Sequence, residues 1–255
     1  MPEVWSLMGK VELKIDWATY EAAKYACTHW HYSKTIPTGK NNYLGAWEGG
    51  NFIGVVIFGL GATGTMGKPY GLNTFQIAEL VRVALKSHIT PVTKIVSISI
   101  KMIMKKNPGL RMLISFADPF HGHNGAIYQA GNWIFTGQCG IGEMYLLRDG
   151  SMAHPRRFTG RGWNKKKPIP ADAVKIKTPG KYRYLMPLDG EMRKQIEPLR
   201  KPYPKRVTKA TSGDRLEGGG AIPTHALQDK RPKQAMESAQ DSQREGSAHP
   251  DAPKK

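Results

Sequence analysis

The sequence predicts a mixed α/β domain whose central sheet is flanked by helices, followed by a basic extension and a disordered tail. Apolar runs at residues 52–59, 77–85 and 110–116 have the length and composition of buried strands. Between the last two runs, Ile95, Ile98 and Met102 recur at helical spacing. Hydrophobic residues make up 40% of the chain, which is enough to fill the core of such a domain.

The first half of the chain is predicted to contain four strands and two helices. A strand at residues 11–15 is followed by a helix at about 17–28, with Asp16 as its N-cap. Strands at 43–47 and 52–59 flank a Gly-Gly turn, and a glycine-rich loop leads to the strand at 77–85. Thr90 and Pro91 then mark the start of a helix that ends before Asn107.

The second half is predicted to continue with the strand at 110–116, a short helix at 124–130 and a strand at 133–136. A hairpin of strands 143–148 and 151–153, a strand at 181–186 and a helix near 190–199 complete the domain. Residues 206–255 are rich in Gly, Ser, Pro, Gln and charge, which is typical of disorder. We therefore divide the chain into a core (1–147), a basic extension that completes the sheet (148–205) and a tail (206–255).

The net charge of +18 is concentrated in one stretch. Residues 148–209 contain 18 basic and 5 acidic side chains, whereas residues 210–255 contain 7 of each. This density favours a polyanionic partner such as nucleic acid, although a merely solvated cationic surface is the alternative. The candidate phosphate contacts lie near Phe158 and Trp163 and are Arg156, Arg157, Arg161, Lys165, Lys166 and Lys167.

Other features of composition point to the cytoplasm. The two cysteines, Cys27 and Cys139, lie far apart and without metal-ligand spacing, which is typical of a reducing compartment. No segment is long and apolar enough to predict a membrane span, and charges interrupt residues 1–14 where a secretory signal would be apolar.

Three residues are the first candidates for catalysis. Arg82 interrupts an apolar strand, so it either pairs with Glu79 or Asp118 or binds an anionic substrate. Asp118 ends a predicted strand and could act as a general base, or it could simply cap the following turn. Tyr128 could protonate a leaving group, or it could pack under the sheet.

Histidines and serines supply further candidates. His29 and His31 are two residues apart and could share a metal ion, although such pairs are more often structural. His121 and His123 could compete as ligands or phosphate contacts. Ser97 and Ser115 are considered only as substrate contacts. If the partner is nucleic acid, Tyr32, Tyr43 and Tyr70 are candidates to stack a base, and ordinary packing is the alternative for each.

The segment from Gly125 to Trp133 resembles a pattern of GNAT acyltransferases, in which a helical Tyr precedes a Gly and an aromatic strand residue. The resemblance implies that the central strand and the following helix cradle the pyrophosphate of acetyl-CoA or a related acyl donor. The usual Gly-x-Gly loop is missing from residues 86–94. A helix N-terminus can still bind phosphate, with Thr90, Thr93, Lys94 and Ser97 as the candidate contacts.

A longer set of motifs, spread over residues 11–205, is similar to the phage Mom family of DNA-modifying proteins. It includes HYSK (31–34), ELVRVAL (79–85), SFADP (115–119), IYQ (127–129) and HPR (154–156). The resemblance implies a transferase that makes N6-carbamoylmethyl adenine in duplex DNA and protects phage DNA from restriction inside the infected bacterium. It also implies iron ligands at His31, Tyr32 and Asp118.

Two alternatives to DNA modification remain open at this point. One is an acetyl-CoA-dependent acyltransferase acting on a small amine or a protein lysine, against which the missing phosphate loop and the basic charge count. The other is a DNA-binding protein without catalysis, against which Arg82, Asp118 and Tyr128 count. We expect a monomer or a weak homodimer.

Overall fold

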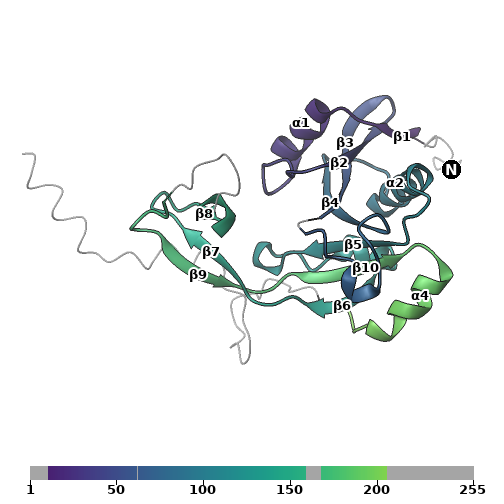
Figure 1. Ribbon diagram of the computed structural model, residues 1–255. Coiled ribbons are helices and arrows are strands. Elements are labelled where there is room, and N and C mark those ends of the chain that lie inside the picture. Colours follow the sequence, from purple (N-terminus) through teal and green to yellow (C-terminus); the bar gives the residue numbers. More distant parts are fainter. Residues whose placement is uncertain (1–10, 62, 159–167, 206–255) are drawn as a thin grey trace, which may run out of the picture. The chain divides into compact units, whose positions relative to one another are not determined.

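The structure is a computed structural model that describes residues 11–61, 63–158 and 168–205 (Figure 1). All of these lie in the first of two units, Met1–Lys209 and Ala210–Lys255. The predicted tail therefore lies outside the described residues. The elements of the main sheet and its helices are β1 (Leu13–Trp17), α1 (Tyr20–Trp30), β2 (Asn41–Glu48), β3 (Asn51–Gly59), β4 (Ile77–Leu85), α2 (Val92–Lys106), β5 (Met112–Ala117), α3 (Ala126–Ala130), β6 (Ile134–Gln138), β10 (Tyr182–Pro187) and α4 (Gly190–Ile196).

A seven-stranded sheet in the order β1-β2-β3-β4-β5-β10-β6 forms the centre of the fold. Every neighbouring pair is antiparallel except β4 and β5, which are parallel. The predicted mixed α/β fold, with a central sheet flanked by helices, is thus confirmed. A second sheet has the order β8-β7-β9 and consists of β7 (Gly142–Leu146), β8 (Met152–Ala153) and β9 (Val174–Thr178).

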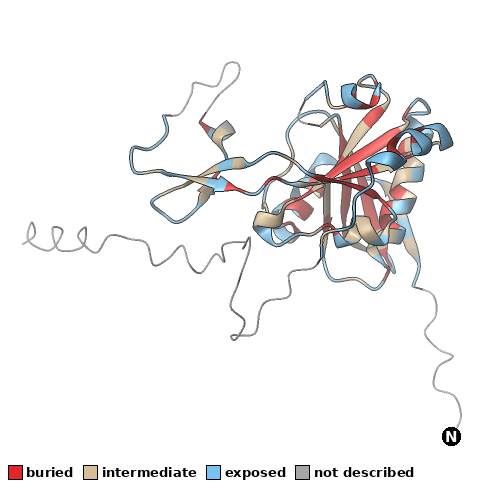
Figure 2. Ribbon diagram, turned by 90° about the horizontal axis from the view of Figure 1, so that it is seen from below, coloured by how far each residue is buried: buried red, intermediate tan, exposed pale blue. Residues whose placement is uncertain are grey.

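The two longest helices cover opposite faces of the central strands, as Figure 1 shows. Val55 and Ile57 of β3 share one buried cluster with the small residues of α1. Val56 and Phe58, which point the other way, share a second cluster with Ile95 of α2. Because both faces of β3 are covered, this strand reads as a continuous apolar run, and burial is concentrated on the central strands (Figure 2).

The helix starts and one strand differ from the sequence prediction. The side chain of Thr19, rather than Asp16, caps α1 by accepting from the backbone amide of Ala22. Helix α2 starts at Val92 and has Pro91 in the cap position, whereas the hydroxyl of Thr90, the predicted cap, hydrogen-bonds Glu48. Strand β9 was not predicted, since its alternating lysines resemble the surrounding basic stretch.

Strand β10 shows how the C-terminal stretch contributes to the main sheet. It pairs with β5 on one side and β6 on the other, so that a segment distant in sequence lies beside the central strands. Arg111 anchors the following helix, because its guanidinium binds Asp189, the N-cap of α4, at 2.8 and 3.0 Å. None of the helices in the described part of the chain combines the length and the hydrophobicity that a bilayer span requires.

Candidate active site

The site forms where β4 and β5 separate. The two strands pair only over Ile77–Glu79 and Met112–Ile114, after which each continues beside a different neighbour. At the first position beyond this ladder, the buried Ser115 hydroxyl contacts the Leu80 carbonyl at 2.7 Å. A side chain thus replaces the missing backbone bond, and the sheet opens beyond it.

Tyr128 of α3 reaches this opening. Its hydroxyl lies 2.7 Å from Ser115 Oγ. The Leu80 carbonyl can only accept, so the Ser115 hydroxyl donates its single proton to that carbonyl. When both bonds form, the Tyr128 hydroxyl must therefore be the donor to Ser115 Oγ. Burial against rings such as those of Trp133 and Tyr184 raises the pKa of Tyr128 to about 12. Tyr128 therefore carries its proton at neutral pH and suits a proton donor, not a base.

Arg82 lies in β4 opposite Ile57, on the face that α1 covers. Its Nη1 donates to the carbonyl of Val81 at 3.1 Å, but its buried Nε has no hydrogen-bond partner among the described residues. A buried N–H without an acceptor is rare and costly in proteins. This geometry fits the predicted role of binding an anionic or strongly accepting group of a substrate.

Asp118 follows the end of β5 and combines two roles. Its Oδ1 accepts from the backbone amide of Phe120 at 3.0 Å, which is the turn-capping role that the sequence left open. Its Oδ2 lies 3.7 Å from Nζ of Lys181. Because the Lys181 contact is longer than a hydrogen bond, Oδ2 of Asp118 has room to accept a proton from a substrate held nearby.

His31 directly follows α1 and is 9% exposed. Its Nδ1 accepts from the backbone amide of Ser33 at 3.1 Å and lies 2.8 Å from the hydroxyl of the same residue. The neutral ring therefore holds its proton on Nε2. Burial, together with the positive charge of Arg82, lowers the pKa of His31 to about 3, so the ring is uncharged at neutral pH.

Tyr32 connects His31 to the loop after β5. Its ring centroid lies 4.3 Å from that of His31 and 4.8 Å from those of both His121 and His123. Burial and then the negative charge of Asp118 raise the pKa of Tyr32. The tertiary structure thus brings together candidate residues from two separate segments, His31-Tyr32 and residues 118–123.

The hydrogen bonding of His31 does not fit its predicted role as an iron ligand together with Tyr32 and Asp118. In the described part of the chain, no group of three or more His, Cys, Asp or Glu side chains is placed to hold a metal ion. An imidazole that binds a metal usually donates its other ring N–H, whereas Nδ1 of His31 accepts a backbone N–H. Iron stays a prediction from the resemblance, and we derive no catalytic step through it.

The predicted donor-binding residues surround the start of α2. Thr90 is buried, Thr93 is partly buried, and Lys94 and Ser97 are exposed. The amide of Thr90, however, already donates to the carboxylate of Glu48 at 2.7 Å. Two amides of the turn before α2, those of Ile89 and Thr90, are therefore already occupied by a carboxylate.

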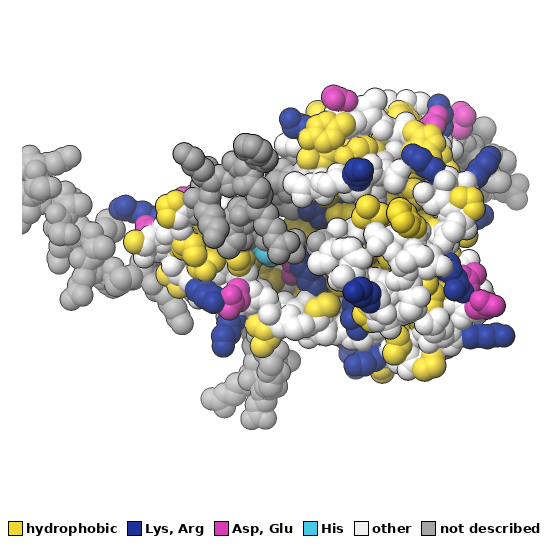
Figure 3. Space-filling view, in the orientation of Figure 1, with side chains coloured by type: hydrophobic (Ala, Val, Ile, Leu, Met, Phe, Trp, Pro, Cys, Tyr) yellow, Lys and Arg dark blue, Asp and Glu magenta, His cyan; other side chains and the backbone are white. Residues whose placement is uncertain are grey.

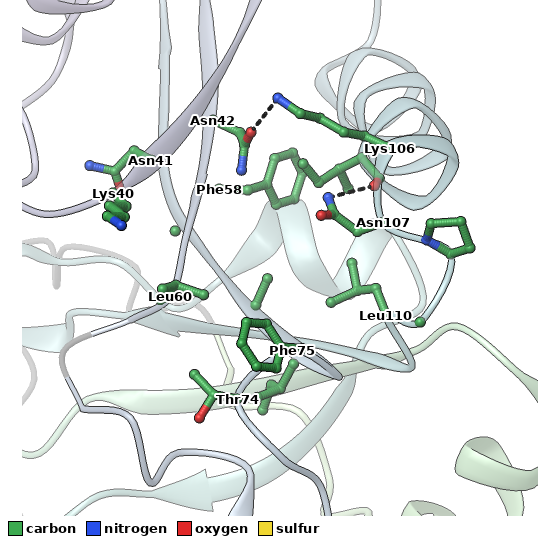
Figure 4. A pocket seen from close by; sticks show the side chains of 16 residues that line it. Lys40, Asn41, Asn42, Phe58, Leu60, Thr74, Phe75, Lys106, Asn107 and Leu110 are labelled. Carbon is green, nitrogen blue, oxygen red and sulfur yellow. Dashed lines mark hydrogen bonds between the residues drawn. The ribbon is translucent and has the colours of Figure 1, made fainter.

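A pocket of about 540 Å³ lies away from this cluster. It is lined by residues such as Ile77 at the start of β4, Leu110 and the exposed ring of Phe75. Figure 4 shows Lys106 of α2 at its wall, with Nζ bonded to Asn42 at 3.0 Å. Its lining includes none of the residues predicted for catalysis, so the pocket and the chemistry do not coincide.

Most of the predicted DNA contacts cannot be placed. Arg161, Lys165, Lys166 and Lys167 lie outside the described residues, as does the side chain of Arg156. Arg157 is described and exposed. On the face drawn in Figure 3, Lys and Arg side chains are spread over several elements and do not form one compact patch.

Two site residues were missed by the sequence analysis. Lys181 precedes β10 and reaches Asp118 only because β10 pairs with β5. Glu48 ends β2 and lies 42 residues from Thr90, its partner in the turn before α2. A lone Glu at the end of an apolar strand was the only available signal for it.

Comparisons with known proteins agree with the resemblance noted from the motifs. A profile of the Mom protein family matches residues 12–205. The methylcarbamoylase Mom of Escherichia phage Mu is 26% identical over 208 residues, which cover 77% of this chain and 86% of that protein.

Among solved structures, a Bacillus subtilis acetyltransferase in complex with CoA has a TM-score of 0.42 and 16% identity, covering 70% of this chain and 100% of that one. An N-acyl amino acid synthase from uncultured soil microbes has a TM-score of 0.42 and 12% identity, covering 73% of this chain and 95% of that one. Both likenesses are weak, and no argument about substrate or cofactor follows from them.

Proposed function

Because this chain belongs to the Mom protein family, we propose that it is a transferase that modifies the N6 amine of adenine in double-stranded DNA. The group transferred in this proposal is carbamoylmethyl, as the motif resemblance implies; the phage Mu relative is named a methylcarbamoylase, which supports the transfer of a small carbamoyl-containing group. The enzyme acts in the cytoplasm of the infected bacterium and protects phage DNA from restriction. The observation that carries the proposal is that the buried Nε of Arg82 has no hydrogen-bond partner among the described residues.

The chemistry follows from the residues around the opening between β4 and β5. As a bond forms between N6 and the transferred carbon, the bond from that carbon to its leaving group breaks, and N6 loses one proton. Asp118 accepts this proton, and Tyr128 donates its own to the leaving group. Arg82 binds the negative charge that the donor carries or develops.

Access to N6 within a duplex requires that adenine leave the base stack. Of the three tyrosines that the sequence suggested for stacking, Tyr32 is 46% exposed, whereas Tyr70 is only 6% exposed. Tyr32 is therefore the ring we assign to the extruded base. The basic stretch around Arg157 contacts the phosphates in this proposal, which fits its charge.

The proposal is tested by expressing the protein in a bacterium and analysing nucleosides from plasmid DNA by mass spectrometry. We expect a heavier adenine nucleoside with the wild type, and a loss of at least about a hundredfold with Asp118→Asn or Tyr128→Phe. Tyr25→Phe, on the exposed face of α1, is the matched control and should modify DNA normally.

Duplex binding measured on the same variants separates catalysis from recognition. Asp118→Asn should bind DNA as the wild type does, because it leaves the basic stretch intact. Unmodified DNA from cells that contain ample soluble wild-type protein would refute the proposal. It would leave an acyltransferase for small amines or a DNA-binding protein without catalysis.

A further inference from the structure

A carboxylate occupies the backbone amides that precede α2. One oxygen of Glu48 accepts from the amide of Ile89 at 2.8 Å, and the other accepts from the amide of Thr90 at 2.7 Å. Glu48 is only 9% exposed and is held in place as the last residue of β2, where it pairs with Leu13 and Asn51. The contact therefore joins two rigid parts of the fold.

The carboxylate is ionised at neutral pH. Hydrogen bonds from the Thr90 hydroxyl and from the amides of Ile89 and Thr90 lower the pKa of Glu48. Both oxygens thus accept N–H groups while carrying a full negative charge. An anion-binding turn is already satisfied by the protein's own anion.

A diphosphate at this turn would compete with Glu48 for the same amides. Its charges would lie next to a buried carboxylate, and displacing that carboxylate would leave it without partners in a poorly hydrated position. Lys86 and Lys94, the lysines nearest to this turn in the sequence, are exposed and so contribute weakly to compensation.

We propose that Glu48 is a specificity-determining residue that excludes donors carrying a diphosphate, CoA thioesters included, from the turn before α2. The donor is a compact molecule without a nucleotide diphosphate, and any anionic group it has is bound by Arg82. This inference rests on the proposed transferase function, because it concerns the donor of that reaction.

The test is a calorimetric titration of the full-length protein with CoA and with acetyl-CoA. We expect no binding to the wild type at ligand concentrations up to about 1 mM. Glu48→Gln removes the charge at nearly constant volume, and Glu48→Ala also removes the competing oxygens. Folded preparations of these variants should bind CoA at least about tenfold more tightly than the wild type. Glu21→Gln removes the same charge from the exposed first turn of α1 and should change nothing.

Two outcomes would overturn the inference. One is wild-type binding of CoA below about 100 µM that free pyrophosphate competes away. The other is that folded Glu48→Gln and Glu48→Ala both bind CoA no better than the wild type. The wild-type titration needs no variant, so it decides the first point even if a substitution prevents folding.

The same samples keep this inference separate from the proposed function. Modified adenine in plasmid DNA tests the transferase, and CoA titration tests Glu48. A wild-type protein that modifies DNA without binding CoA supports both statements. If the wild-type protein modifies DNA and also binds CoA tightly at this turn, the proposed function stands and the inference about Glu48 is wrong.

Discussion

Replacing Ser115 with alanine tests the side-chain bond that ends the β4–β5 ladder. The Ser115 hydroxyl is 1% exposed and contacts both the Leu80 carbonyl and the Tyr128 hydroxyl at 2.7 Å. The substitution leaves two poorly hydrated groups without this partner, and each lost bond costs about 1 kcal/mol. We therefore expect Ser115→Ala to lower the free energy of unfolding by about 2 kcal/mol.

Ser99 provides a matched control for this measurement. It is also fully buried, but its hydroxyl donates to Ile95 one turn earlier in the same helix, at 2.9 Å. Alanine is the better helix former, so Ser99→Ala should change the stability by no more than about 0.5 kcal/mol. Equilibrium urea unfolding followed by tryptophan fluorescence measures both variants, and the dependence on urea should keep its slope.

The double variant Ser115→Ala/Tyr128→Phe refines the test. Tyr128→Phe alone removes one bond and leaves Ser115 attached to Leu80, so it should cost less than Ser115→Ala. If the hydroxyls interact as we describe, the two losses overlap by about 1 kcal/mol in the double-mutant cycle. Additive losses, or a Ser115→Ala effect as small as that of Ser99→Ala, would refute this account of the opening.

Two further predictions concern pH and backbone geometry. The folded pKa of His31, about 3, lies below its ordinary value of 6.5, so the unfolded chain takes up a proton first as pH falls and the wild type loses stability between those values. At about pH 5 this loss of stability is at most about 2 kcal/mol. His31→Gln should therefore reduce the difference between the urea midpoints measured at about pH 7.5 and at about pH 5. If the variant leaves that difference unchanged, groups other than His31 cause the pH dependence. Gly54 has a φ of +141°, and an added Cβ would lie 2.0 Å from the carbonyl oxygen of Ala84. Gly54→Ala should therefore lower the free energy of unfolding by about 3 kcal/mol or more. A soluble Gly54→Ala protein with wild-type urea unfolding would contradict the geometry of β3.

The strands and helix starts differ in how closely their bounds could be predicted from sequence. Residues 77–85 were predicted with the bounds that β4 has, because seven of these nine residues are apolar and polar residues flank them. The capping of α1 was predicted three residues too early, since Asp16 and Thr19 are both good caps and only the end of β1 decides between them. Strand β9 escaped prediction because its pairing with β7 is a property of the folded chain.

Candidate site residues were found where a local pattern was unusual. Arg82 interrupts an apolar strand, and Asp118 ends one, so both could be named from sequence. Lys181 could not, because its contact with Asp118 requires β10 to pair with β5, and strand order within a sheet is not encoded in either segment alone.

The sequence by itself determined most of the elements, the mixed α/β class, the basic stretch and the family, since each depends on residue type and spacing along the chain. Only the tertiary structure decided which amides remain available to a ligand and which side chains meet. Glu48 fills the turn before α2, and Tyr128 is bound to Ser115, because long-range strand pairing and helix packing bring these groups within hydrogen-bond distance. Hydrogen bonds act over about 3 Å, so a shift of one residue in register would break these contacts without changing the pattern from which the fold was predicted.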